Sequence, residues 1–312
     1  MKKAFVIVVL VLAALTMVSC SKSSESKTAL VGYVINNMND TFQTYIVDAF
    51  KEYYADKPDY TVEVQDAQED VVKQQDHVNN LINKGAKALV VVPVNTSAMG
   101  PITQAAQDAG ISLVYVNRNP FGESNPPANI YYVGSQEIVA GTLQAEAMGA
   151  LLNGTGGVCI LMGKLDNEGA ILRTKGNKDT IASKFPGISI LAEETGNWQR
   201  DQGMSLTENW ITAHGSNLKG ILGNNDEMAL GAVEALKAAN RTDVIVMGVD
   251  AIPDARVAVA GGDMSATVLQ DAVGQGRGAA EAAYKALQGQ SQDPISWIPF
   301  VLIDKSNIAQ YQ

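Results

Sequence analysis

The sequence predicts an α/β fold made of two similar, doubly wound parallel-sheet lobes. Short apolar runs alternate with longer amphipathic stretches, the pattern of parallel strands covered by helices on both faces. The chain has 312 residues, more than a single hydrophobic core usually serves. The alternation pauses at the Pro- and Asn-rich segment 121–129 and then resumes at residue 130. We therefore expect one lobe before this pause and a second lobe after it.

The N-terminal segment has the features of an export leader. Residues 1–19 combine a basic start with an apolar run that is shorter than the roughly 20 residues of a membrane span, as in a secretory signal peptide. Cys20 resembles a bacterial lipobox cysteine, which is acylated and becomes the mature N-terminus. Residues 20–27 are polar and low in complexity, as in a flexible tether. We expect a protein in the periplasm or on the outer face of the cell membrane, held by a lipid anchor only; a secretory peptide that stays uncleaved, or is cleaved elsewhere, is the alternative.

The elements within the lobes follow from local patterns. Near-continuous apolar runs predict buried strands at 29–35, 88–93, 111–116, 157–162, 220–222 and 244–249. Apolar residues at helical spacing predict helices over 41–54, 227–239 and 271–288. The segment 295–303 is predicted to be extended. Periodicity alone leaves open which lobe the last two segments complete.

Composition and motifs argue against several functions. The chain has 33 acidic and 23 basic residues, so its field repels phosphate backbones, and we expect no nucleic-acid partner. Cys159 lies in a strand-like run and is expected to be a buried apolar residue. No histidine has a partner at metal-ligand spacing, no G-x-S-x-G occurs, and G-Q-G-R-G (274–278) lacks the dinucleotide-loop spacing. We therefore expect that the protein is not an enzyme and that it binds no cofactor and no metal.

Polar residues that directly follow strands indicate a binding site. In parallel sheets the carboxyl ends of the strands share one edge, where ligands bind. The residues at this edge are 36–40, Asn117, Arg118, 224–226 and Asp250. Amides, carboxylates and guanidinium groups hold adjacent hydroxyls, and Phe42 and Trp198 offer ring faces, so a polyol is the natural ligand. Alternatively, Asp40 and Asp226 are helix N-caps, Asn117 and Arg118 a solvated strand end, and Trp198 a packing residue.

The chain resembles bacterial periplasmic sugar-binding proteins of the ribose/galactose type, the receptors of ABC importers. The resemblance covers residues 29–304. The segments that carry it are D-T-F (40–42), N-K-G-A-K-A-L-V-V-V-P (83–93), V-N-R (116–118), N-N-D-E-M-A-L-G-A-V-E-A-L-K-A (224–238) and V-M-G-V-D-A-I-P-D-A (246–255).

This resemblance implies the type I periplasmic-binding-protein fold, in which two lobes joined by a three-strand hinge enclose a ligand cleft. The N-terminal lobe would comprise 28–134 with 270–297, and the C-terminal lobe 135–269 with 298–312. Ligand-contacting positions would be Asp40, Phe42, Asn117, Arg118, Arg173, Trp198, Asn225, Asp250 and Gln270. Phe42 and Trp198 would sandwich the ring, and Arg118 would be compensated by sugar oxygens and by Asp40 or Asp250.

The chain departs from galactose and glucose receptors at several positions. Gly169 stands near the place of an acidic ligand residue, Gln270 replaces an Asn, and segment 149–157 has no counterpart of the calcium loop. The V-N-R-N-P segment (116–120) equally suits inositol receptors, so galactose-, glucose- or ribose-like sugars and cyclitols all stay open.

The resulting expectation is a monomeric, lipid-anchored substrate-binding protein. It would bind a neutral monosaccharide or cyclitol by hinge closure and deliver it to an ABC permease in the membrane. The alternatives are a sugar sensor that serves a chemotaxis or two-component receptor without transport and, from a different class, a sugar-modifying enzyme.

Overall fold

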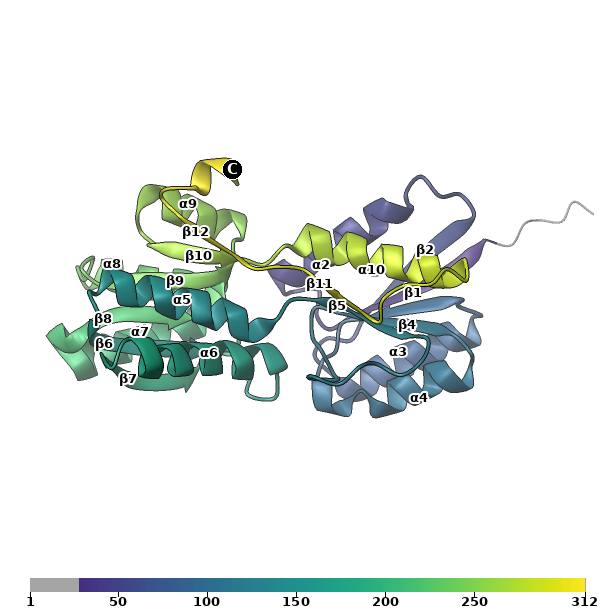
Figure 1. Ribbon diagram of the computed structural model, residues 1–312, viewed down its shortest axis with the longest axis horizontal. Helices are drawn as coiled ribbons and strands as arrows, with labels where there is room; N and C mark the ends of the chain where they lie inside the picture. Colours follow the sequence, from purple (N-terminus) through teal and green to yellow (C-terminus); the bar gives the residue numbers. More distant parts are fainter. Residues whose placement is uncertain (1–27, 312) are drawn as a thin grey trace, which may run out of the picture.

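The computed structural model describes residues 28–311, so Cys20 and the rest of the leader lie outside the described residues. Two six-stranded sheets, with orders β11-β5-β4-β3-β1-β2 and β12-β10-β9-β8-β6-β7, form the centres of two lobes that lie side by side (Figure 1). Helices cover both faces of each sheet, which confirms the predicted fold class. Within residues 28–311 no helix is long and apolar enough to cross a membrane.

The first lobe is an entirely parallel sheet between two pairs of helices. Its strands are β1 (Ala29–Ile35), β2 (Tyr60–Asp66), β3 (Ala88–Val91), β4 (Ser112–Val116), β5 (Ile130–Gly134) and β11 (Ile295–Trp297). Helices α2 (Thr41–Tyr54) and α10 (Ala272–Leu287) cover one face, and α3 (Val71–Asn83) and α4 (Gly100–Asp108) cover the other. The fully buried strands β3 and β4 lie in the middle of the sheet.

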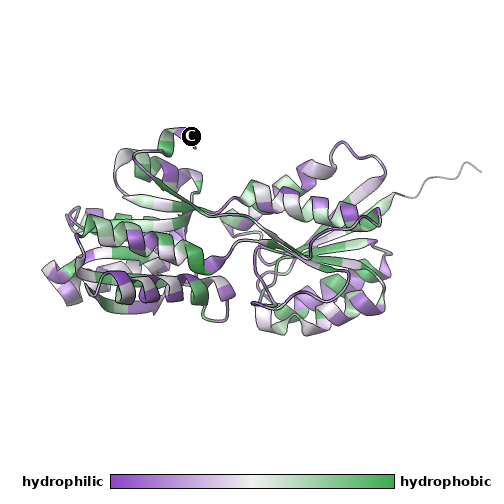
Figure 2. Ribbon diagram, viewed as in Figure 1, coloured by the Kyte–Doolittle hydropathy of each residue, from purple (hydrophilic) through white to green (hydrophobic). Residues whose placement is uncertain are grey.

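The second lobe repeats this arrangement. Its strands are β6 (Thr155–Met162), β7 (Gly187–Thr195), β8 (Leu218–Gly223), β9 (Ile245–Asp250), β10 (Ala266–Leu269) and β12 (Val301–Asp304). Helices α5 (Glu137–Leu151) and α6 (Glu168–Lys184) cover one face; α7 (Arg200–His214), α8 (Asp226–Ala238) and α9 (Pro253–Gly261) cover the other. Strand β12 pairs antiparallel with β10 at the sheet edge. Figure 2 shows hydrophobic residues concentrated on the strands and on the helix faces turned toward them.

The chain passes between the two sheets three times. It leaves the first sheet after β5, returns after β10 to form α10 and β11, and crosses again to β12. The last segment therefore contributes to both lobes, which answers the question that periodicity left open.

Two features expected from sequence have structural roles. The G-Q-G-R-G segment lies inside α10, where a side chain on Gly276 would come within 2.3 Å of the Ile46 carbonyl oxygen on α2. It is thus a close helix contact. Cys159 is a free, fully buried cysteine on β6, and burial raises the pKa of its thiol to about 12.

Candidate functional site

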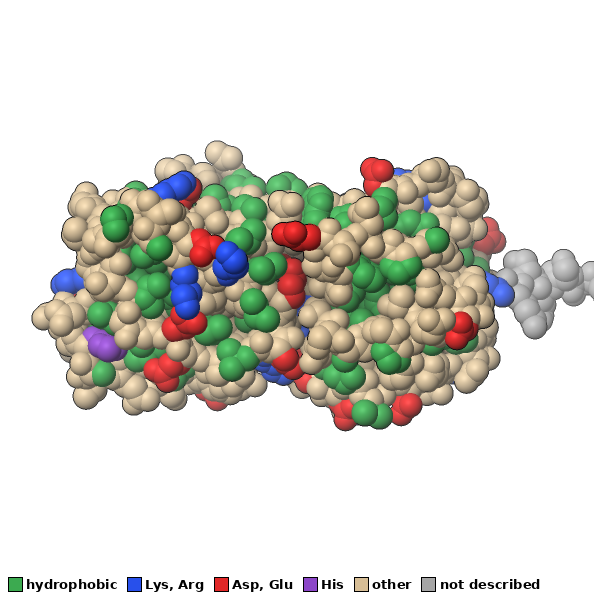
Figure 3. All heavy atoms as spheres, turned by 60° about the horizontal axis from the view of Figure 1, so that its bottom comes forward, with side chains coloured by type: hydrophobic (Ala, Val, Ile, Leu, Met, Phe, Trp, Pro, Cys, Tyr) green, Lys and Arg blue, Asp and Glu red, His purple; other side chains and the backbone are tan. Residues whose placement is uncertain are grey.

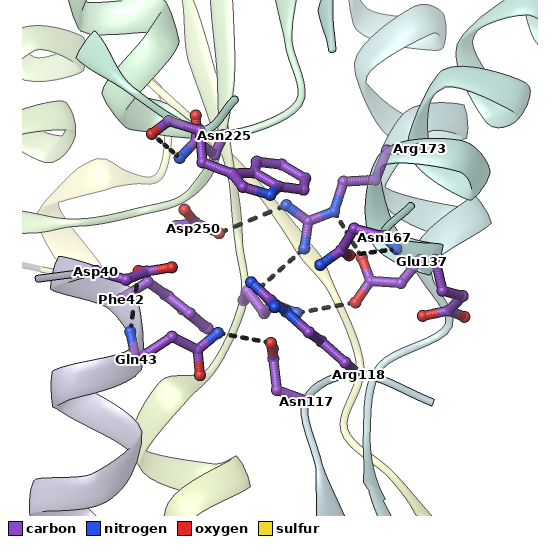
Figure 4. A pocket seen from close by; sticks show the side chains of 14 residues that line it. Asp40, Phe42, Gln43, Asn117, Arg118, Glu137, Asn167, Arg173, Asn225 and Asp250 are labelled. Carbon is purple, nitrogen blue, oxygen red and sulfur yellow. Dashed lines mark hydrogen bonds and ion pairs between the residues drawn. The ribbon is translucent and has the colours of Figure 1, made fainter. Parts of the chain in front are cut away.

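A cavity between the lobes brings together all nine predicted ligand residues. The cavity is small, because side chains from both lobes leave little free space between them. It is lined by Asp40, Phe42, Gln43, Asn117, Arg118, Glu137, Asn167, Glu168, Gly169, Arg173, Trp198, Asn225, Asp250 and Gln270. Figure 3 shows the boundary between the two lobes from outside, with acidic side chains along it. In Figure 4 the side chains from both lobes point toward one shared space.

The start of α2 supplies one wall. Asp40 is the N-cap of this helix, and its carboxylate accepts a hydrogen bond from the Gln43 backbone N–H at 3.2 Å. The predicted capping role is therefore confirmed, and the same residue also lines the cavity. Burial raises the pKa of the Asp40 carboxyl, while the positive charge of Arg118 opposes that rise.

A chain of amides orients the next side chains. Asn117 follows β4 in the left-handed region, at φ 69°, which turns its side chain toward α2. Its Oδ1 accepts from Gln43 Nε2 at 2.8 Å, and its Nδ2 donates to Gln275 Oε1 at 3.1 Å. Gln275 in turn donates to Ser135 Oγ at 3.1 Å. This chain fixes the Gln43 amide so that Oε1 is left for another partner (Figure 4).

Arg118 is buried and lines the cavity, but its expected ion pair with Asp40 or Asp250 is wrong for this structure. Its Nη1 donates to the backbone carbonyls of Pro93 and Val94, at 2.9 and 3.3 Å. No carboxylate among residues 28–311 lies within 4.0 Å of this guanidinium. The carbonyls that follow β3 turn toward Arg118 and compensate its charge, whereas Asp250 is engaged by a different arginine.

That arginine is Arg173, on α6. Its Nε donates to Glu137 Oε2 at 2.6 Å, Nη1 to the Asn224 carbonyl at 2.6 Å, and Nη2 to Gln270 Oε1 at 3.0 Å. Asp250 lies 3.7 Å from Nη1 (Figure 4). Burial opposes the charged form, but Glu137 and Asp250 outweigh it and raise the pKa of Arg173. The guanidinium is thus a permanent charge at the centre of the cavity.

Sequence reasoning missed four lining residues, Gln43, Glu137, Asn167 and Glu168, and named Gly169 only as standing near a ligand position. Asn167 is the N-cap of α6, and its Oδ1 accepts from the Gly169 backbone N–H at 3.0 Å. Its capping position ahead of an acidic first turn was the one signal in the sequence. Burial, and next the charge of Glu137, raise the pKa of Glu168 to about 8.

Four buried polar atoms of the lining have no hydrogen-bond partner within the described residues. They are Gln43 Oε1, Asn167 Nδ2, Glu168 Oε2 and Trp198 Nε1. Two accept and two donate. Such groups cost free energy unless a ligand or water satisfies them. Gln43 lies in the first lobe, whereas Asn167, Glu168 and Trp198 lie in the second. A single ligand that contacts all four atoms would bridge the two lobes.

Asp226, predicted at the same edge, lies elsewhere. It is the fully buried first residue of α8, where it accepts hydrogen bonds from Thr267 Oγ1 at 2.7 Å and from the Ile252 backbone N–H at 3.0 Å. The N-cap of α8 is Asn225, which accepts from the Met228 backbone N–H. Burial raises the pKa of Asp226 to about 7. Asp226 is thus a structural residue.

Polar contacts also join the lobes at the rim of the cavity. Lys164 forms an ion pair with Glu69 at 2.7 Å, and Asn95 donates to Asp166 at 3.3 Å. Glu69 has φ 60°, a left-handed conformation that β-carbon contacts disfavour. Residues 28–311 contain no group of three or more His, Cys, Asp or Glu side chains arranged to hold a metal ion.

Known proteins resemble the chain over nearly its whole length. A Rhizobium meliloti protein named for rhizopine binding is 40% identical, covering 96% of this chain and 97% of its own. The xylitol-binding protein of Mycolicibacterium smegmatis is 36% identical over 78% of this chain and 69% of its own. A solved ABC transporter solute-binding protein of Bacillus halodurans, with bound myo-inositol, is 37% identical, with a TM-score of 0.86 over 93% of this chain and 99% of that one.

The family profile described as "Periplasmic binding protein domain" matches residues 31–291. Proteins of this family bind solutes and are not enzymes. The predicted resemblance is confirmed: this chain belongs to the periplasmic binding proteins of the ABC-transporter type.

Proposed function

We propose that this protein is the receptor of an ABC importer and captures a polyol ring, a sugar or a cyclitol, between its lobes. The four unpartnered buried atoms carry this proposal. They include both donors and acceptors, and a hydroxyl group can donate and accept at once. Phe42 and Trp198 add aromatic surface to the same cavity, suited to the C–H faces of a ring. By this reading Cys20 is acylated and tethers the receptor to a membrane.

The ligand would act by closing the hinge. Groups that it satisfies lie on both lobes, so it binds the closed state better and shifts the population toward it. The rim ion pair between Lys164 and Glu69 forms only when the lobes are close and supports the same state. The permease would recognise the closed form.

The relatives favour a cyclitol or an open-chain polyol over a galactose-type sugar. The solved relative holds myo-inositol and another is named for xylitol. Arg173 and Gln270, which are tied together at 3.0 Å, offer donors to ring hydroxyls.

A thermal-shift panel of myo-inositol, galactose, glucose, ribose and xylose tests this proposal. A ligand at 100 times its dissociation constant should add about 2.7 kcal/mol to the unfolding free energy. We expect the largest shift with myo-inositol. The absence of a shift with every polyol would contradict the proposal. Loss of ligand uptake in cells lacking the protein would support import; intact uptake with a lost signalling response would support a sensor instead.

A further inference from the structure

The turn that follows β9 has a strained backbone. Asp250 is the last residue of β9 and lines the ligand cavity. It has φ 121°, and the next residue, Ala251, has φ 55°. A β-carbon disfavours positive φ angles, so this conformation costs free energy and persists only where surrounding groups hold the backbone. The groups that hold the turn therefore decide where the Asp250 side chain lies.

The Asp250 side chain has no hydrogen bond that would fix its direction. Within residues 28–311 its carboxylate has no hydrogen-bond partner, and the only cation within 4.0 Å is Arg173, whose Nη1 lies 3.7 Å away (Figure 4). That separation is too long for a hydrogen bond. The direction of the carboxylate therefore follows from the backbone of the turn.

Asp226 holds this backbone from the interior of the second lobe. Its Oδ2 accepts a hydrogen bond from the Ile252 backbone N–H at 3.0 Å, and its Oδ1 accepts one from the Thr267 hydroxyl at 2.7 Å. The same hydroxyl accepts from the Ala251 backbone N–H at 3.2 Å. Two consecutive amides of the strained turn are thus bound to one carboxylate, one directly and the other through Thr267.

The surrounding structure leaves room for this carboxylate alone. Asp226 and Thr267 are both fully buried. On β9, a β-carbon at Gly248 would collide with Asp226 Oδ1. Asp226 also begins α8, directly after the cap Asn225, which lines the cavity. The carboxylate ties α8, β10 and the turn after β9 together, and it does not itself line the cavity.

We propose that Asp226 is a positioning residue, which fixes the turn that presents Asp250 to the ligand and so sets ligand affinity without touching the ligand. This inference rests on the proposed function, because the polyol would bind in the cavity that Asp250 lines. An ionised carboxylate accepts hydrogen bonds at both oxygens, which matches the donors on either side of Asp226.

The variant Asp226→Asn keeps the shape of the side chain and removes one acceptor. Its amide has a single accepting oxygen, so the Ile252 N–H or the Thr267 hydroxyl loses its acceptor, and a buried donor without a partner is costly. The turn can then relax toward ordinary φ angles, and this relaxation moves the Asp250 carboxylate from its present place.

Isothermal titration calorimetry with myo-inositol at pH 8 tests this inference. Burial raises the pKa of Asp226 to about 7, so its carboxyl is mostly ionised at this pH. Asp226→Asn should raise the dissociation constant at least tenfold. Thr267→Val, which removes the bridging hydroxyl, should raise it at least threefold, whereas Thr267→Ser, which keeps a hydroxyl, should stay within twofold of the wild type.

A matched control separates affinity from stability. Thr207→Val removes another fully buried hydroxyl of the same lobe, which donates to the Gly203 carbonyl within α7. It should leave the dissociation constant unchanged. Urea unfolding of each variant measures the loss of stability independently. If Asp226 were only structural, Asp226→Asn would lower the unfolding free energy and keep the wild-type dissociation constant.

Hydrogen exchange measured by NMR tests the turn in the ligand-free protein. The Ala251 and Ile252 amides should exchange at least tenfold faster in Asp226→Asn than in the wild type. The amides of β6 report the general loss of stability, and their exchange should accelerate less. Thr267→Val should accelerate the Ala251 amide in the same way, so the test does not depend on one variant.

Three results would overturn the inference or its basis. Wild-type dissociation constants in both Asp226→Asn and Thr267→Val would remove the role of Asp226 and leave the proposed function intact. Unchanged exchange of the Ala251 and Ile252 amides in Asp226→Asn would remove it without any ligand. Failure of myo-inositol and of every other polyol to bind the wild-type protein would overturn the proposed function, while the exchange rates would still decide whether Asp226 holds the turn.

Discussion

Replacing Arg173 by methionine should destabilise the ligand-free protein by roughly 3–5 kcal/mol. The side chain is 5% exposed, and methionine occupies a similar apolar volume. The change removes hydrogen bonds to Glu137, to the Asn224 carbonyl and to Gln270, at 2.6, 2.6 and 3.0 Å. It also leaves Glu137, 2% exposed, buried without its cation. The uncompensated carboxylate dominates the cost, because a typical intact hydrogen bond contributes only about 1 kcal/mol net.

Urea unfolding without ligand measures this loss. The companion variants are Glu137→Gln and the double variant Arg173→Met with Glu137→Gln. If the buried charge is the main cost, the double variant should be more stable than Arg173→Met alone, because neutralising Glu137 removes the stranded carboxylate. A loss below 1 kcal/mol in Arg173→Met, or a double variant whose loss is the sum of the two single losses, would show that the stranded Glu137 carboxylate is not the main cost.

Three further predictions concern the site, the rim and the pH dependence. Trp198→Ala should raise the dissociation constant for the ligand about 30-fold, equivalent to about 2 kcal/mol of lost apolar burial, as measured by calorimetry. Lys164→Met should weaken ligand binding by up to about fivefold, because exposed ion pairs contribute at most about 1 kcal/mol. The difference in affinity between this variant and the wild type should shrink in high salt, which screens the ion pair. Burial raises the pKa of Asp226 from 3.8 to about 7. Between these pH values the folded protein holds a proton that the unfolded chain releases, so the unfolding free energy should fall as pH rises. This fall should be smaller in Asp226→Asn.

Each of these predictions has its own control. Trp198→Phe keeps an aromatic face while removing the indole N–H, and equal losses in both Trp198 variants would attribute the effect to the hydrogen bond. Lys178→Met breaks an ion pair with Glu193 within one lobe, and a similar loss of affinity there would argue against the rim contact. An unchanged pH profile in Asp226→Asn would show that another group dominates that range.

The sequence indicated the part of the site that follows the strands. Asn117, Arg118, Asn225 and Asp250 come directly after apolar runs, and the shared edge of parallel strands brings such residues together. Position in the chain could not separate Asn225 from Asp226. Asn225 caps α8 and lines the cavity, whereas Asp226 turns inward to Thr267. That choice depends on helix phase and on tertiary partners.

Other site residues and two strands could not be predicted from the sequence, for similar physical reasons. Gln43 and Glu137 belong to first helical turns, and only the approach of the other lobe or of Arg173 gives them a role. Strands β2 and β7 lie at sheet edges, where half-buried polar residues interrupt the apolar run, so neither was predicted. The partner of Arg118 was predicted wrongly because backbone carbonyls near Pro93 leave no mark in the side-chain pattern.

Small-angle X-ray scattering with and without ligand tests closure of the two lobes most directly, because it measures the size of the protein. If a ring held by both lobes favours the closed state, saturation with the best ligand of the thermal-shift panel should reduce the radius of gyration. Trp198→Ala and Arg173→Met should need more ligand to reach the compact form. An unchanged radius of gyration at saturating ligand, with binding established by calorimetry, would contradict closure around the ligand.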